Sequence, residues 1–121
     1  MIKSSHSKQY DLEDRTLKFS KRVRIFIKLL PKNTGNFEDS KQLVRSSGSI
    51  GANYIEANES LSKKDFKYRI SISRKEAKET IYWLNLLDVG KNTKLKKNQE
   101  ELITETTELM KIFGSILSKS K

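Results

Sequence analysis

Residues 63–89 read KKDFKYRISISRKEAKETIYWLNLLDV, a stretch in which an apolar or small residue returns every three or four positions. This spacing follows the turn of an α-helix and places the recurring side chains on one side of it. Ser62 and Asp65 are spaced as in a capping box, so the helix should begin at residue 63. Its core-facing residues are Phe66, Ile70, Ser73, Ala77, Ile81 and Leu84.

Three other stretches show the same periodicity and predict helices over residues 11–30, 38–59 and 94–118. Pro31, Gly35 and Gly90 fall between the periodic stretches, as expected of loops. The core-facing residues of these helices are Leu12, Thr16, Phe19, Val23, Phe26, Leu30; Leu43, Ser47, Ile50, Tyr54, Ala57, Leu61; and Leu95, Leu102, Leu109, Phe113, Leu117. We therefore predict an all-α fold, a single-domain antiparallel up-and-down four-helix bundle over residues 11–121, preceded by a flexible segment of residues 1–10.

The composition argues against catalysis and against a bound metal. The 121 residues include no cysteine and a single histidine, His6, which removes thiol chemistry and leaves no basis for His-based sites. Glu56, Glu76 and Glu79 could form a carboxylate site, but the Glu-x-x-His pairs of di-iron bundles are absent. We expect a protein that is not an enzyme and that uses no cofactor and no metal.

The charge balance indicates a polyanionic partner. Lys and Arg number 25 against 15 Asp and Glu, a net charge of +10, which makes nucleic acid the leading partner class. No apolar run is long enough to span a membrane, and the first residues lack the apolar core of a signal peptide. We expect a cytoplasmic protein with no membrane partner.

A basic sector on the helix predicted from residue 63 is the first candidate site. It covers an arc of roughly 100° without an acidic residue, and it consists of Lys64, Lys67, Ser71, Arg74, Lys75 and Lys78, with Tyr82 at its end. Contacts from this sector to phosphates would be independent of base sequence and sensitive to salt. The first helix could add Lys21, Arg22, Arg24 and Lys28. The alternative is a solvated lysine-rich face that keeps a small protein in solution.

Two helices carry more apolar residues than one core can bury. Ile25 and Leu29 point away from the core-facing side of the first helix, and a third sector of the helix from residue 63 mixes aromatic, apolar and acidic side chains. We predict a subunit interface made of Ile25, Leu29, Tyr68, Ile72, Glu79, Trp83 and Leu86. The alternative is that these are scattered surface hydrophobes. Glu56 either pairs with a basic group of a neighbouring helix or subunit or is solvated.

Residues 42–87 carry motifs that resemble a known family, the bacterial four-helix bundle proteins encoded in intervening sequences of 23S ribosomal RNA genes. The matching pieces are a Ser-Ile-x-x-Asn-x-x-Glu signature at Ser49, Ile50, Asn53 and Glu56, a Ser-x-x-acid-Phe helix start at Ser62, Asp65 and Phe66, and a glutamate at Glu79. The likeness extends over residues 11–119. It implies a four-helix bundle that assembles as a ring-like homopentamer with a basic surface and has no catalytic activity.

The chain is also similar to the accessory protein of diversity-generating retroelements, a pentamer that binds nucleic acid and a reverse transcriptase. Together with the charge, these resemblances imply an oligomeric, non-catalytic protein that contacts the phosphate backbone of RNA or DNA, with a reverse transcriptase as a possible partner. The alternative function is a structural or adaptor oligomer that recruits a protein partner and has no direct role on nucleic acid.

Overall fold

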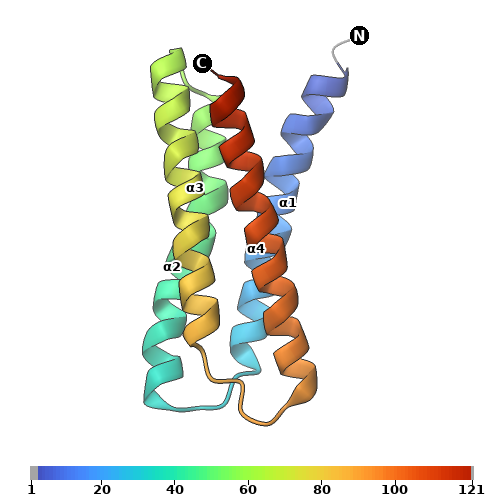
Figure 1. The fold of residues 1–121 in the computed structure, drawn as a ribbon, viewed down its shortest axis with the longest axis vertical. Coiled ribbons are helices and arrows are strands. Elements are labelled where there is room, and N and C mark those ends of the chain that lie inside the picture. Colours follow the sequence, from blue (N-terminus) through green and yellow to red (C-terminus); the bar gives the residue numbers. More distant parts are fainter. Residues whose placement is uncertain (1–2, 121) are drawn as a thin grey trace.

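A computed structural model describes residues 3–120, with side chains described from Leu12 onward. It contains α1 (Lys3–Lys28), α2 (Thr34–Asn58), α3 (Lys63–Leu86) and α4 (Thr93–Lys119). The four helices run up and down in turn, so that the α1–α2 and α3–α4 loops lie at one end and the α2–α3 loop at the other (Figure 1). The predicted single-domain four-helix bundle is confirmed.

The helix boundaries follow the capping residues. The Ser62 hydroxyl accepts a hydrogen bond from the Asp65 amide at 3.0 Å, as the sequence predicts. Asn33 caps α2 in the same way through the Asn36 amide, and for this reason α2 begins four residues before the predicted start at residue 38.

At the N-terminus, α1 begins at Lys3 rather than at residue 11. Residues 1–2 of the expected flexible segment lie outside the described residues. The flexibility of residues 1–10 stays a prediction.

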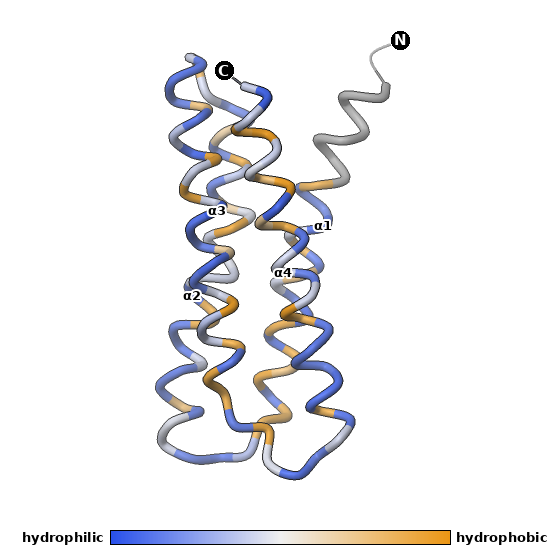
Figure 2. Tube along the Cα trace, in the orientation of Figure 1, coloured by the Kyte–Doolittle hydropathy of each residue, from blue (hydrophilic) through white to orange (hydrophobic). Residues whose placement is uncertain are grey.

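The core consists of the side chains that the periodicity selects. All six core-facing residues predicted for α1 are buried, and hydrophobic residues recur along each helix (Figure 2). Phe66 and Leu117 are half-buried at the margin of the core, whereas Ile81 is half-buried beside Thr80, which is the buried residue at this turn of α3. The prediction for Leu61 was wrong: this side chain is fully exposed because α2 ends at Asn58 and Leu61 lies in the following loop.

The order of the helices around the bundle decides which surfaces adjoin. Each helix packs against its neighbours in sequence, and α4 closes the bundle against α1 through the least extensive of these contacts. In the described part of the chain, α1 does not contact α3, so these two helices lie diagonally opposite. Arg15 joins α1 to α4 by two hydrogen bonds to Glu105, at 2.7 and 2.8 Å, and one to Glu108 at 3.1 Å.

One end of the bundle is held by buried amide side chains. The Asn36 amide donates to the carbonyls of Pro31 and Asp88, and its oxygen accepts from the Asp88 amide at 2.9 Å. Gln99 donates to the carbonyls of Leu84 and Leu87 at the end of α3. These bonds tie the α1–α2 loop to the α3–α4 loop and satisfy polar groups that burial would otherwise leave without partners.

Gly51 lies at a close approach of α1 to α2. A Cβ atom added there would lie 2.7 Å from the Thr16 hydroxyl oxygen and 3.0 Å from its Cβ. Thr16 is buried and its hydroxyl donates to carbonyls of its own helix, so it has little room to move. A Cβ at Gly48, three residues earlier in α2, would meet no atom within 4 Å.

These two glycines predict opposite effects of the same substitution. Gly48→Ala should raise the free energy of unfolding by up to about 1 kcal/mol, because alanine is the better helix former. Gly51→Ala should lower it by about 1–2 kcal/mol, because overpacking outweighs that gain. Urea denaturation followed by circular dichroism compares the two variants with the wild type. Equal stabilisation by both would contradict the close approach.

Candidate nucleic-acid interface

The basic surface of α3 consists of five cationic side chains on its outer face, and we call it the α3 basic stripe. Its members are Lys64, Lys67, Arg74, Lys75 and Lys78. Lys67 is half-buried and the other four are exposed. Within the described residues, no acidic side chain forms a salt bridge with any of the five. The stripe therefore presents positive charge that no salt bridge among the described residues offsets, although Lys75 lies near enough to Glu79 to help hold the pKa of that carboxylate below its ordinary value.

Exposed aromatic rings border the stripe on the same helix. Tyr68 is 61% exposed and Tyr82 is 59% exposed. The Arg69 guanidinium lies 5.9 Å from the centre of the Tyr68 ring, and the Tyr82 ring packs edge-on against Trp83. Cations with accessible aromatic rings beside them are the residue types that nucleic-acid-binding surfaces use for phosphates and unpaired bases.

The cations predicted on α1 lie apart from the α3 basic stripe. Lys21, Arg22, Arg24 and Lys28 are all exposed, but their helix is diagonally opposite α3, so one subunit does not join them into a continuous surface. Arg22 also shares a cavity of about 300 Å³ with Glu100, Glu101, Glu105 and Glu108 of α4. These nearby carboxylates weaken the attraction of Arg22 for a phosphate, and Lys97 of the same cavity acts in the opposite sense.

The predicted subunit-interface residues form two strips on opposite sides of the bundle. Ile25 and Leu29 are 60% and 58% exposed, and Ile25 lines a small cavity with residues of α4. The α3 strip lies toward α2, because Glu79 is bonded to Arg45 of that helix. Tyr68 and Leu86 of this strip are exposed, whereas Ile72, Glu79 and Trp83 are half-buried.

A network between α2 and α3 uses part of the second strip within the subunit. The Trp83 indole donates to Glu79 at 2.8 Å, and Arg45 forms salt bridges with Glu79 and, at 3.2 Å, with Glu76. The Trp83 hydrogen bond and the Arg45 guanidinium hold the pKa of Glu79 below its ordinary value. Arg45 could not be identified as the partner from periodicity, because the pairing crosses between helices and periodicity shows only which side of one helix a residue occupies.

The family-motif residues take different places at the α2–α3 contact. The Asn53 side chain donates to the Ser49 carbonyl of its own helix at 2.9 Å, and Arg69 of α3 donates to the Asn53 oxygen at 3.2 Å. Ile50 is buried in the core, and its carbonyl accepts from the Ser73 hydroxyl of α3 at 2.9 Å. Glu56 is exposed and forms no salt bridge with another described residue. Asn53 and Ile50 thus join α2 to α3 within the subunit.

A metal site and a membrane-spanning helix are two further features that the described part of the chain could hold. No three His, Cys, Asp or Glu side chains gather there in a way that could hold a metal ion. Nor does any helix of residues 3–120 have the length and apolarity needed to cross a membrane.

Comparisons with known proteins agree with this architecture. Residues 8–115 match the family described as 23S rRNA-intervening sequence protein. The crystal structure of a protein of unknown function from the S23 ribosomal protein family of Bacteroides thetaiotaomicron VPI-5482 is 37% identical to this chain, with a TM-score of 0.76. That alignment covers 88% of this chain and 97% of the other. No curated protein matches at a significant level. The chain belongs to the 23S rRNA-intervening sequence protein family.

Proposed function

We propose that this protein is a non-catalytic, oligomeric nucleic-acid-binding protein of the cytoplasm that contacts the phosphate backbone of RNA or DNA through its basic helix surfaces. The observation that carries the proposal is the α3 basic stripe, five cations on one outer helix face without a salt bridge among the described residues. Lysine and arginine side chains that serve only solubility are commonly paired or interspersed with aspartate and glutamate on a protein surface. A row of cations without salt bridges can contact a phosphate backbone without reading its sequence.

The oligomer is the second part of the proposal. Two apolar strips that face opposite ways suit a contact in which one surface of a subunit meets a different surface of the next, and such contacts close into rings. By resemblance to its family we propose a homopentamer. Five copies of the stripe would then engage one polyanion together, with an affinity well above that of a single subunit.

A reverse transcriptase is the protein partner that we propose, on the resemblance to retroelement accessory proteins. The second candidate function, a structural or adaptor oligomer, is favoured by the exposed apolar strips, since Ile25 and Leu29 offer a surface that proteins recognise. In that case the positive charge would serve only to keep the protein in solution.

A salt titration separates the two functions. Structured RNA and duplex DNA should both bind at ~50 mM salt, and the logarithm of the affinity should fall linearly as the logarithm of salt rises, because each phosphate contact releases a counterion. Fluorescence anisotropy at a series of salt concentrations gives this slope. Absence of binding at low salt, or an affinity that ignores salt, would exclude phosphate contacts and favour the adaptor.

A further inference from the structure

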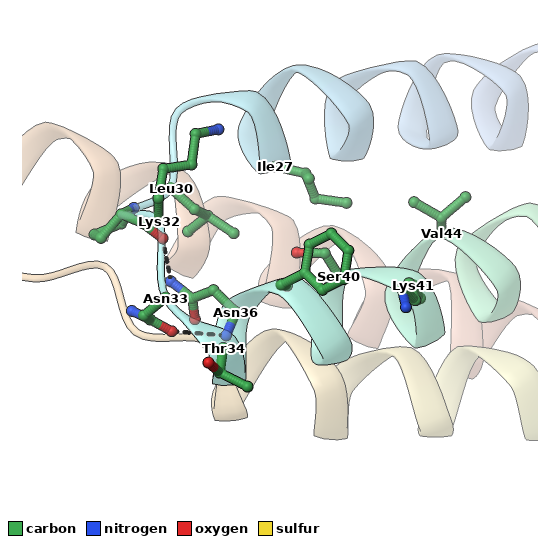
Figure 3. Close-up of a pocket in the computed structure, with 11 residues that line it drawn as sticks. Ile27, Leu30, Lys32, Asn33, Thr34, Asn36, Ser40, Lys41 and Val44 are labelled. Carbon is green, nitrogen blue, oxygen red and sulfur yellow. Dashed lines mark hydrogen bonds between the residues drawn. The ribbon is translucent and has the colours of Figure 1, made fainter.

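A concave surface lies at the end of the bundle, between the last turn of α1 and the first three turns of α2, and we call it the α1–α2 groove. Its volume is about 610 Å³. Figure 3 shows Ile27 and Leu30 reaching into it from the α1 side, with Val44 and Ser40 on the α2 side. Neither the α3 basic stripe nor the apolar strips include any of its residues. Periodicity does not predict this groove, because Phe37, a principal wall residue, precedes residue 38, the predicted start of the second helix.

The wall of the groove combines an open aromatic ring with positive charge. The Phe37 side chain is 64% exposed, which is an unusually large exposed fraction for a phenylalanine. The Lys41 ammonium lies 4.4 Å from the centre of its ring, and Lys32 is a second cation in the wall. None of the eleven residues that line the groove is acidic. Lys41 itself bonds to Glu38 at 3.3 Å, outside this wall.

Polar groups in the wall are available for hydrogen bonding. The Ser40 and Thr34 hydroxyls line the groove, and neither takes part in a hydrogen bond that the structure records. The Asn36 side-chain amide, by contrast, is already hydrogen-bonded to Pro31 and Asp88 of the two loops. Dashed lines in Figure 3 mark hydrogen bonds of Asn36 to the residues drawn. The groove is thus apolar at its sides, aromatic on one wall and edged by cations and hydroxyls.

We propose that the α1–α2 groove binds one unpaired nucleotide of a single-stranded nucleic acid, with its base against Phe37 and its phosphate near Lys32 and Lys41. The volume suits a small planar group, since ligand pockets of roughly 300–1,000 Å³ hold molecules of this size. Base stacking on an exposed aromatic side chain beside cations is a recurrent means of binding single strands. The inference rests on the proposed nucleic-acid function and adds to it a preference for unpaired bases at a site separate from the phosphate contacts of α3.

A protein segment or a second copy of this chain is the competing occupant. An apolar side chain from either source would pack against Phe37 through its volume and hydrophobicity, and this packing does not require an aromatic ring. A base stacks on the face of the ring and therefore does require it. Phe37→Leu preserves an apolar side chain and removes the ring, so it distinguishes these occupants, whereas Phe37→Tyr preserves the ring.

The test uses the full chain, a short single-stranded RNA that carries one 2-aminopurine, and a duplex RNA of equal charge. Phe37→Leu should weaken binding of the single strand by about tenfold and reduce the change in 2-aminopurine fluorescence, because one stacking contact is lost. It should leave duplex affinity unchanged. Phe37→Tyr should bind as the wild type does. Ile55→Ala is the matched control, because Ile55 is an exposed apolar residue of α2 outside the groove.

Each other outcome has a defined meaning. If the wild type binds both RNAs and Phe37→Leu binds the single strand equally well, the groove inference is wrong and the proposed function stands. If the wild type binds neither RNA, both are wrong. A lower mass in light scattering for Phe37→Ala, which removes the apolar volume together with the ring, would assign the groove to contact between copies and overturn the nucleotide site.

Discussion

Replacing Lys75 and Lys78 together by glutamate should lower the affinity for duplex RNA by about a hundredfold or more at low salt. Two phosphate contacts are lost in each subunit and two repulsive charges take their place, and every subunit of an oligomer carries the change. Both side chains are exposed and form no salt bridge in the described structure, so the fold should persist. The salt dependence should also become shallower, by about one unit of slope for each phosphate contact removed.

The matched control places the same charge change on another helix. Lys21→Glu with Lys28→Glu also lowers the net charge of the chain from +10 to +6, on the exposed surface of α1. Its effect should be clearly smaller, because α1 lies diagonally opposite the α3 basic stripe. Anisotropy titrations of both double variants provide the comparison. Equal losses would mean that the stripe has no special part in binding, and that either the predicted α1 cations contact phosphates equally or overall charge controls the affinity.

The architecture could be predicted because helical periodicity is a local property. Phe19, Ile50 and Leu109 are buried as their spacing indicates, and the capping pair Ser62 and Asp65 marks the start of α3. Leu61 shows where this reasoning fails, since it continues the periodic pattern of α2 after the backbone has left the helix. The pattern indicates where a side chain would point if the helix continued. The helix does not continue, because it ends at Asn58 with Glu59 as its C-cap.

The candidate site could be predicted only in the part that one helix carries. Lys75 and Lys78 share a face of α3 through their spacing alone, and the structure keeps them exposed. Contacts and separations between helices could not be predicted, because periodicity does not indicate which helices are neighbours. The separation of Lys28 from the stripe, the pairing of Arg45 with Glu79 and the groove at Phe37 all depend on that arrangement. The Asn33 cap was a sequence signal that could have placed Phe37 on α2.

Replacing Ile25 and Leu29 by glutamate should convert the assembly into monomers. Both side chains are more than half exposed in the subunit, so the change should cost little folding stability, whereas two carboxylates buried between subunits would be strongly unfavourable. Trp83 is a poorer choice for this test, although we predict it at the interface. It packs on the core and bonds to Glu79, so its removal would disturb the fold as well as the assembly.

The expected masses are about 70 kDa for a ring of five 14.0 kDa chains and 14.0 kDa for the variant, measured by light scattering after size-exclusion chromatography. Far-ultraviolet circular dichroism should show the same helicity for both. Affinity for RNA should fall by about a hundredfold or more although no basic residue has changed, because the stripes no longer act on one polyanion together and the two added carboxylates lower the net charge of each chain from +10 to +8. A monomeric wild type at micromolar concentration would end the ring hypothesis. A dissociated variant that keeps full affinity would show instead that a single α3 basic stripe is sufficient for binding.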